Sequence, residues 1–359
     1  MRSCHGKPFY NSLRSSKNMF TVYDAVQDRA SWRKTLAKLP AHARDIYADP
    51  DYISLFSFEP GTRGTCVVFE RGKHLWLHAF LLQPIGADRF DIETAYGYGG
   101  PSSNTQDSAF LTAAQAAYTE WLATHGVIAE FLRLHPLIEN RAFVNGTIER
   151  DRTTCSIDLT KPVQFNSKVQ NMLNRARKAG VDVQRVSAVD HVDTFHAMYD
   201  ANMAALDADS FYRFDRDFFA NLAPLLDRQG VLLAAVLEGR WVAASMFLHA
   251  KPYLHYYLSA MDLDARVPGT VNLLLNEAAL IGQTLGCERF HLGGGRTATE
   301  KDSLLLFKKS VCTDEHDFHI SKRVVDPEGY AAICDAWRHA HPEMAERYGH
   351  RILCYRYFS

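Results

Sequence analysis

Apolar positions along the first half of the chain alternate between strand-like and helix-like spacing. Segments 64–71 and 74–85 are apolar runs of strand length, and the turn between them is typical of a hairpin. Residues 107–126 carry apolar side chains three and four positions apart, which predicts a helix with a polar cap and a glycine beyond its end. A shorter helix with a Ser cap is predicted at 31–40, and a further strand at 127–136.

The second half of the chain repeats this plan. A basic helix is predicted at 164–180 and a strand at 181–187, and two more helices follow before residue 230. Residues 231–260 have the pattern of three strands in a meander. Segment 255–295 then gives strand, loop, long amphipathic helix and strand. Two copies of one mixed α/β plan are therefore predicted, with the division between residues 153 and 162.

The composition narrows the class of protein without naming a function. With 359 residues and 47% apolar side chains, the chain is long enough for two domains with separate cores. Its net charge of −1 gives no overall attraction to nucleic acid or lipid, and no apolar run reaches the roughly 20 residues of a membrane span. DNA is therefore not an expected partner, membrane contact is at most peripheral, and any anion would bind at a local cluster.

The cysteines and the N-terminus add two expectations. The seven scattered cysteines, without a secretion signal, predict reduced thiols in a cytoplasmic protein. Cys312, His316 and His319 lack partner ligands at a zinc-like spacing, so no metal site is expected. Residues 1–18 are basic and polar, and we expect a loose leader there.

The loop at 266–270 has a pattern suited to binding an anion. N–H groups at the start of a helix are unpaired and carry partial positive charge, so they attract a group such as pyrophosphate. Gly269 lets the backbone approach such a ligand, Arg266 adds a two-pronged donor, and Thr270 follows. A Pro-Gly turn at the start of a core helix is an equally good interpretation of the motif by itself.

Further motifs give this loop a family context. The chain contains YGYGGP at 96–101, FLRLHPLIEN at 131–140, CSIDL at 155–159, NRARKAGVDV at 174–183, FHLGGG at 290–295 and DSLLLFKKS at 302–310. In this order they resemble the FemAB family, aminoacyl-tRNA-dependent transferases built from two GNAT-like domains. The similarity spans about residues 20–325.

The resemblance implies a fold class and domain limits. The fold would be α/β (α+β), with two GNAT-like domains, each a mixed, mostly antiparallel sheet flanked by helices. The first domain, on the acceptor side, would cover 19–156, and the second, on the donor side, 157–325. Segment 326–359 would form a helix and a strand that pack back on the first domain.

The resemblance also implies an acyltransferase, in which an amine attacks an activated ester directly. The first hypothesis is transfer of an aminoacyl group from tRNA to an amine of a cell-envelope precursor, which is a small molecule or is linked to lipid. The second hypothesis keeps the fold but takes acyl-CoA as the donor and an amino sugar of a surface polysaccharide as the acceptor. A third is a binding module without catalysis. Aminoacyl-tRNA or acyl-CoA would be a co-substrate, and no tightly bound cofactor is expected.

Candidate catalytic and donor-binding residues follow from these motifs. Lys308 is the leading candidate, because the resemblance places its lysine at the donor–acceptor channel; a strand-edge lysine in solvent is the alternative. Asp302 would orient Lys308, accept a proton or cap a turn, and His291 is a candidate base that is more often a core histidine. The donor would be held by Arg266, Gly269, Thr270, Gly293, Gly294, Gly295 and Arg296.

The acceptor is expected in a groove between the two domains. Arginine forks suit phosphate, which makes Arg133 a candidate, with an ordinary salt bridge as the alternative. Arg175 lies on a basic helix that would face a tRNA acceptor stem or a nucleotide-linked substrate, although a solvated surface explains any one of its charges. The candidates on this side are Tyr96, Tyr98, Gly99, Arg133, His135, Arg175 and Tyr256.

Overall fold

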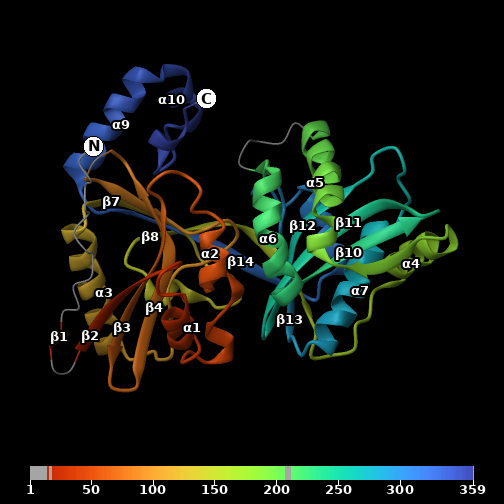
Figure 1. Ribbon diagram of the computed structural model, residues 1–359, viewed down its shortest axis with the longest axis horizontal. Coiled ribbons are helices and arrows are strands. Elements are labelled where there is room, and N and C mark those ends of the chain that lie inside the picture. Colours follow the sequence, from red (N-terminus) through yellow and green to blue (C-terminus); the bar gives the residue numbers. More distant parts are fainter. Residues whose placement is uncertain (1–13, 16–17, 87, 207–211, 359) are drawn as a thin grey trace. The chain divides into compact units, whose positions relative to one another are not determined.

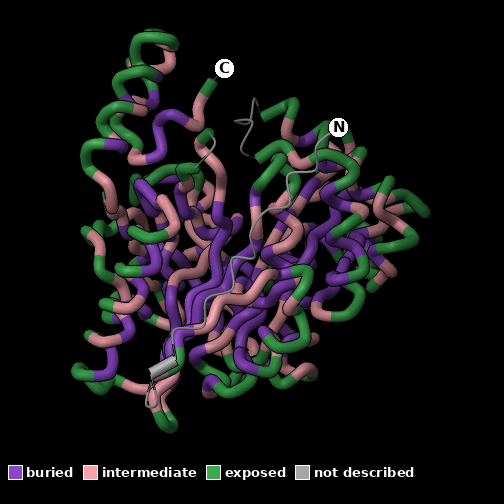
Figure 2. The backbone as a smooth tube through the Cα atoms, turned by 60° about the vertical axis from the view of Figure 1, so that its left-hand side comes forward, coloured by how far each residue is buried: buried purple, intermediate pink, exposed green. Residues whose placement is uncertain are grey.

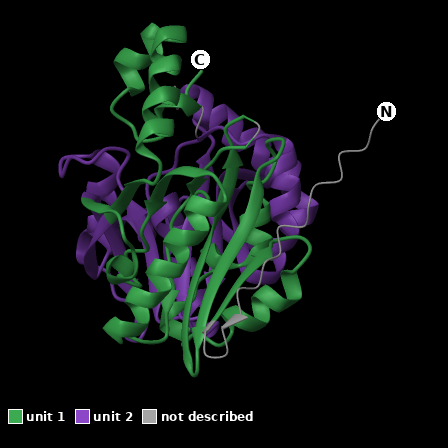
Figure 3. Ribbon diagram, turned by 90° about the vertical axis from the view of Figure 1, so that its left-hand side faces the viewer, with its two compact units in different colours: residues 1–149, 319–359 green, residues 150–318 purple. Residues whose placement is uncertain are grey.

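The computed structural model describes residues 14–15, 18–86, 88–206 and 212–358. The chain folds as two compact units, residues 1–149 with 319–359 and residues 150–318 (Figures 1 and 3). It passes between them inside two strands, β8 (Thr147–Asp158) and β14 (Asp314–Val324). The alternating pattern of a strand continues through such a crossing, so it does not mark where one unit ends. Most of the leader expected at 1–18 lies outside the described residues.

Unit 1, the first of these, combines a sheet with short helices. Its elements before β8 are β1 (Arg14–Ser15), β2 (Asn18–Asp24), α1 (Arg29–Leu36), η1 (Ala41–Ala43), η2 (Ile46–Ala48), α2 (Pro50–Ser54), β3 (Arg63–Arg71), β4 (His74–Pro84), β5 (Phe90–Glu93), β6 (Ser102–Ser103), α3 (Ser108–Thr124), β7 (Val127–Arg133) and η3 (Asn140–Phe143). The helix predicted from Ser31 begins two residues earlier, at Arg29, so Ser31 lies inside α1 and does not cap it.

The strands of unit 1 form a sheet in the order β1-β2-β3-β4-β5-β7-β14, to which β14 contributes 320–324. All neighbours are antiparallel except β5 and β7, which run parallel because α3 carries the chain back between them. Asp107 starts α3 by accepting a hydrogen bond from the N–H of Phe110 at 2.7 Å. The buried face of α3, including Phe110 and Tyr118, then packs into the core with Trp76.

The C-terminal segment completes unit 1 with α9 (Pro327–Ala340), α10 (Pro342–Tyr348) and η5 (Cys354–Arg356). Trp337 and Tyr355 pack with Ile128 of β7. The terminal strand that we expected is wrong within 326–358, because this stretch forms two helices and a short 3-10 turn. Its aromatic side chains are buried by helix packing and need no strand partner.

Unit 2, residues 150–318, follows the same kind of plan. Its elements between β8 and β14 are α4 (Ser167–Lys178), β9 (Asp182–Val186), α5 (Ala188–Ala205), α6 (Arg216–Gln229), β10 (Gly230–Leu237), β11 (Arg240–Ala250), β12 (Tyr253–Met261), α7 (Thr270–Thr284), β13 (Arg289–Gly294) and α8 (Ser303–Val311). Its strands form a sheet in the order β8-β13-β12-β11-β10-β9. Only β12 and β13 are parallel neighbours, joined through α7.

Each unit buries apolar side chains between its sheet and its helices. In unit 2, Phe247 and Phe290 from the strands pack with Leu274 of α7 and Leu173 of α4. Figure 2 shows the buried positions running along the strands while helices and turns carry the exposed ones. Within the described ranges, no helix is long and apolar enough to cross a bilayer.

Candidate functional site

Strands β12 and β13 of unit 2 separate partway along their length. They pair in parallel at three positions, from Tyr253 with Arg289 to His255 with His291. Beyond these positions β12 continues along β11 to Met261, and β13 continues along β8 to Gly294. Both strands change register at the point of separation, which bends them as a β-bulge does. A gap between two parallel strands leaves backbone groups free to bind a ligand.

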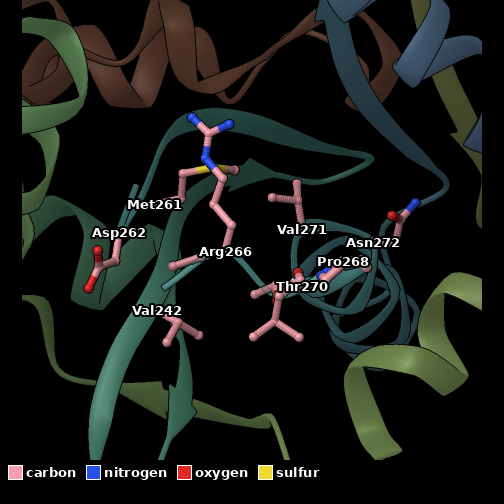
Figure 4. A pocket seen from close by; sticks show the side chains of 11 residues that line it. Val242, Met261, Asp262, Arg266, Pro268, Thr270, Val271 and Asn272 are labelled. Carbon is pink, nitrogen blue, oxygen red and sulfur yellow. Dashed lines mark hydrogen bonds between the residues drawn. The ribbon is translucent and has the colours of Figure 1, made fainter. Parts of the chain in front are cut away.

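A cavity of about 340 Å³ lies at the start of α7, at the end of β12. Its volume lies in the range of small-molecule sites, about 300–1,000 Å³. In Figure 4, Val242 and Met261 line one side, Thr270 and Val271 line the other, and Arg266 extends between them. The complete lining is Val242, Ala243, Met261, Asp262, Arg266, Val267, Pro268, Gly269, Thr270, Val271 and Asn272.

The first turn of α7 faces this cavity without a side-chain cap. Gly269 is the N-cap residue, with φ of 91°, and it makes no side-chain hydrogen bond to the helix. A Cβ atom at this position would collide with the carbonyl oxygen of Met172 in α4, so both conformation and packing require glycine. Thr270 donates its hydroxyl to the Val267 carbonyl at 2.8 Å, which makes it part of the turn. The N–H of Thr270 donates to the Val267 carbonyl at 3.3 Å, so the N–H groups of Val271 and Asn272 are the ones that this end of α7 can offer to an anion.

Arg266 is the basic residue of the cavity lining. Arg266 is exposed and makes no ion pair with any described residue. Lys168 and Arg175, two turns apart on one face of α4, are also exposed and without an ion pair in the described ranges. Asp262 is the acidic residue of the lining, and its carboxylate already accepts the N–H of Asp264 at 2.9 Å. Arg266 is therefore the group of this lining that can pair with an anionic ligand.

Lys308 lies on the buried face of a helix, so the alternative of a strand-edge lysine in solvent is wrong. Segment Ser303–Val311 forms α8, and Leu305, Lys308 and Val311 share its inner face at helical spacing. Lys309 points outward, where it pairs with Glu300 and Glu315 at 2.8 Å each.

The amine of Lys308 is buried beside Gly293, Gly294 and Gly295, which we call the glycine bend. It is 7% exposed, donates to the Gly294 carbonyl at 2.7 Å and lies 5.8 Å from the centre of the Tyr256 ring. Burial lowers the pKa of Lys308 from its ordinary value of 10.5 to about 8, although the charge of Asp302 partly opposes this. A pKa near neutrality lets this amine exchange a proton under ordinary conditions.

Asp302 caps α8. Its carboxylate accepts the N–H groups of Leu304 and Leu305 at 2.9 and 3.0 Å, and both donors of Thr297 at 3.1 Å. Burial acts to raise the pKa of Asp302, but these hydrogen bonds, first that of Leu305, outweigh it and lower the pKa to about 2. The carboxylate therefore stays ionised near neutral pH. This favours the capping alternative, with an electrostatic influence on Lys308.

Packing explains the small residues of the glycine bend. A Cβ atom on Gly294 would lie 2.7 Å from the Thr153 carbonyl oxygen, and one on Gly295 would lie 2.6 Å from Oδ1 of Asp302. Arg152, which sequence reasoning missed, donates to the carbonyls of Gly295 and Arg296 at 3.0 and 3.2 Å. Gly293 has φ of 75° and falls at the register shift of β13. Protein atoms thus fill the space beside Gly294 and Gly295.

Two other candidates in unit 2 lie deeper than a solvent-facing base would. His291 and His255 are each 1% exposed, with ring centres 5.7 Å apart, at the last paired position of β12 and β13. Burial inside the sheet favours the core-histidine alternative for both. Tyr256 is the first residue beyond this pair, and burial raises the pKa of its hydroxyl. Its ring stacks on Phe247 at 5.7 Å.

The candidates of unit 1 are held by their own neighbours. Arg133 forms an ion pair with Glu93 at 2.6 Å, which is the salt-bridge alternative. Nε2 of His135 lies 2.5 Å from Asp45, and its Nδ1 accepts the N–H groups of residues 137 and 138. Gly99 pairs with Leu134 as an isolated bridge.

Tyr98 packs against Tyr47 at 5.7 Å, and Tyr96 packs against Phe56 at 6.5 Å. The structure thus gathers these unit 1 candidates, Tyr96, Tyr98, Gly99, Arg133 and His135, around a turn that is already filled by protein contacts. Their side chains have structural partners inside unit 1.

Comparisons with known proteins agree with this geometry. Residues 165–301 match the family model of the acetyltransferase (GNAT) domain. FemX superposes with a TM-score of 0.67 at 12% identity, covering 85% of this chain and 98% of FemX. The C-terminal domain of a putative lysylphosphatidylglycerol synthetase from Agrobacterium fabrum gives 0.54 at 13% identity, covering 81% of this chain and 92% of that one.

A conserved protein of unknown function from Bacteroides thetaiotaomicron gives a TM-score of 0.56 at 9% identity, over 82% of this chain and 96% of that one. No curated protein matches the chain in sequence.

Residues 165–301 thus match a GNAT acetyltransferase domain, which supports an acyltransferase, and this match lies in unit 2. The predicted FemAB-like arrangement is confirmed at the level of the fold by its similarity to FemX.

Proposed function

We propose that this chain transfers an activated aminoacyl group from tRNA to an amine of a cell-envelope precursor, at a site in unit 2. The observation that carries the proposal is the uncapped first turn of α7, which faces a cavity bordered by Arg266. An ester carried on a phosphate-rich molecule fits a site of positive charge and free N–H groups. Lys168 and Arg175 extend that charge along α4, where an RNA backbone would follow.

Unit 2 has the groups that direct transfer needs. The acceptor amine attacks the ester carbonyl, a C–N bond forms, and the C–O bond to the tRNA ribose breaks. The amine loses a proton in this step, and the ribose oxygen gains one. We propose that Lys308 accepts the proton that the attacking amine loses. Its pKa of about 8 makes part of its population neutral near pH 7.

Our proposal for the acceptor rests on the solved structures that are similar to this chain. One of them is described by its name as a lysylphosphatidylglycerol synthetase, which indicates an amino acid joined to a lipid headgroup. We therefore include lipid-linked precursors among the acceptors, met at the cytoplasmic face of the membrane, where aminoacyl-tRNA is available.

A second candidate donor is acyl-CoA, with an amino sugar of a surface polysaccharide as the acceptor. The match of residues 165–301 to an acetyltransferase domain favours this alternative. CoA carries a pyrophosphate that the first turn of α7 would bind in the same way. The two donors differ in length, because only tRNA has a backbone that extends far beyond the cavity.

A binding comparison separates the two donors. Wild-type protein, Arg266→Ala, Arg175→Ala and the matched control Arg177→Ala are titrated with aminoacyl-tRNA and with an acyl-CoA thioester. Arg177 lies on the same helix as Arg175 but points to another side, so its loss is expected to change little. With tRNA as the donor, both Arg266→Ala and Arg175→Ala weaken binding, and affinity falls steeply with salt.

With acyl-CoA as the donor, Arg266→Ala weakens binding while Arg175→Ala matches Arg177→Ala. If neither donor binds, or if both bind equally well to wild type and Arg266→Ala, the proposed site is wrong.

A further inference from the structure

The cysteines of the described residues include two close pairs. All six described cysteines are free thiols. In unit 1, Sγ of Cys334 lies 3.6 Å from Sγ of Cys354, between α9 and η5. In unit 2, the thiols of Cys155 and Cys312 interact with each other, and Sγ of Cys312 also donates to the Lys309 carbonyl at 3.6 Å. The two pairs differ in their surroundings, and this difference predicts different reactivity.

The unit 2 pair lies next to Gly293 and Lys308 of the candidate site. Cys155, on β8, is fully buried and faces Gly293 across the β8–β13 pairing. Cys312 ends α8 and is partly exposed. The N–H of Thr313 donates to the Ser156 carbonyl at 2.9 Å, which fixes the backbone next to each cysteine. The two side chains are therefore held together by the fold.

Exposure makes Cys312 the accessible member of the pair. Its interaction with Cys155 lowers the pKa of Cys312, although burial and the charge of Glu315 oppose this effect. The same interaction, followed by burial, raises the pKa of Cys155. In unit 1, both thiols are buried, and burial raises the pKa of Cys354 to about 11. A peroxide needs an accessible sulfur, and of these two pairs the unit 2 pair has a member, Cys312, that is partly exposed.

We propose that Cys312 and Cys155 form a reversible disulfide when the protein meets a peroxide. The Cys312 thiolate attacks one oxygen of hydrogen peroxide, the O–O bond breaks, and hydroxide leaves a sulfenic acid on Cys312. The sulfur of Cys155 then attacks this sulfur, the S–S bond forms, and the sulfenic oxygen leaves as water with the Cys155 proton. Two thiols are oxidised and one peroxide is reduced to water.

The disulfide would act on the neighbourhood of Lys308. The N–H of Cys312 donates to the carbonyl of Lys308 at 3.0 Å, one helical turn away, and Cys155 is an electrostatic neighbour of the Lys308 amine. Joining the two sulfurs fixes the end of α8 to β8 and removes the Cys155 thiol from beside that amine. Loss of transfer on oxidation is the expected result, and this part rests on the proposed function.

The test measures the bond before it measures activity. Full-length protein carrying Cys4→Ser is treated with hydrogen peroxide, its free thiols are alkylated, and its peptides are mapped by mass spectrometry. A cross-link between the Cys155 and Cys312 peptides should appear first and disappear with dithiothreitol. Cys312→Ser should abolish it, and Cys334→Ser should leave it unchanged. Cys312 that stays fully alkylated after peroxide, or a cross-link that forms first between Cys334 and Cys354, would overturn the proposal.

Transfer is then compared in oxidised and reduced protein. The link to Lys308 predicts that transfer is lost on oxidation, returns with dithiothreitol and is insensitive to peroxide in Cys312→Ser. Equal transfer before and after full cross-linking would overturn that link. A cross-link without transfer in either state would support the disulfide and count against the proposed function alone.

Discussion

Both units contain the same structural pattern, but the two parallel strands of that pattern pair over a longer stretch in unit 1 than in unit 2. In each, antiparallel strands lead into a helix and then into a parallel strand: β5, α3 and β7 in unit 1, and β12, α7 and β13 in unit 2. In unit 1 the parallel pairing extends from Phe90 to Glu93, and hydrogen bonds from Thr94 and Gly99 continue it to Arg133. In unit 2 the pairing stops after three positions. The strands β5 and β7 therefore stay hydrogen-bonded to their ends, whereas β12 and β13 separate.

The helices of this pattern, α3 and α7, also differ in the residue that caps their first turn. Asp107 places a carboxylate on the first turn of α3, where an external anion would otherwise bind. At α7 the corresponding residue is Gly269, which has no side chain to offer.

Charges near the gap follow the same contrast, since Arg133 of unit 1 is paired with Glu93 and Arg266 of unit 2 has no partner among the described residues. The proposed ligand site therefore lies in the unit whose own side chains leave the start of this helix unoccupied.

The largest expected effect is on transfer. Lys308→Met should lower the rate of transfer by about 100-fold or more, because general acid–base catalysis contributes on that scale. In wild type, the rate should rise with pH up to about 8, where Lys308 becomes neutral. Lys308→Arg keeps the charge but cannot lose its proton near neutral pH, so it should lose the rate as well. Steady-state transfer assays from pH 6 to 9 measure both effects.

Lys308 also predicts a pH-dependent stability difference. Its folded pKa lies below the unfolded value, so the unfolded chain binds more protons between pH 8 and 10.5. Wild type should therefore gain about 3 kcal/mol relative to Lys308→Met over this window. Urea unfolding at several pH values measures it. Lys309→Met, with an exposed ion pair, is the control, and a similar pH slope for both variants would contradict the burial account.

The next effect is on the stability of unit 1. Arg356 holds the buried Asp91 with two hydrogen bonds of 2.9 and 3.0 Å, and Arg356→Met should cost about 3–5 kcal/mol because it leaves a buried charge unpaired. Burial, opposed by Arg356, raises the pKa of Asp91 to about 6. The folded state therefore binds more protons above pH 4, and stability from this group falls as pH rises to 6.

The deficit of Arg356→Met should thus be larger at pH 7.5 than at pH 5 in urea unfolding. Arg338→Met removes an exposed pair with Asp335 and should cost less than about 1 kcal/mol. Equal losses in the two variants would show that the Asp91 contact is not what holds the C-terminal segment.

The smallest effect is at the cap of α3. Asp107→Ala should destabilise the protein by about 1 kcal/mol, because it removes the acceptor for the N–H of Phe110. Asp107→Asn keeps an acceptor at this position and should recover most of the loss. No difference between the two variants in the urea midpoint would mean that the carboxylate does not cap this helix.

Periodicity in the sequence was enough to predict α3, α7 and the meander β10–β12. It failed at 303–311, because a short apolar run fits a buried strand as well as a helix. The Asp302 cap was the available signal for a helix, and the apolar residues three apart place Lys308 on its inner face. The motif identified the lysine, while its burial came only from the fold.

Partners distant in sequence explain the remaining failures. Arg133 and Glu93 are 40 residues apart, and His135 and Asp45 are 90 apart. The residue types are correct for binding phosphate, but no local pattern reveals that each already has a partner. Arg152 is hidden in the charged start of β8, and its bonds to Gly295 and Arg296 depend on β13 lying next to that strand.

The central claim is that the open first turn of α7 binds an anionic donor, and Val271→Asp tests it most directly. This change places in unit 2 a carboxylate like that of Asp107, and an acid in the first turn stabilises a helix by about 0.3–1 kcal/mol, so folding should be preserved. Donor affinity should fall at least about tenfold relative to Val271→Asn, since the carboxylate repels the phosphate that the N–H groups attract. Donor binding that is equally tight in Val271→Asp, Val271→Asn and wild type would contradict the account.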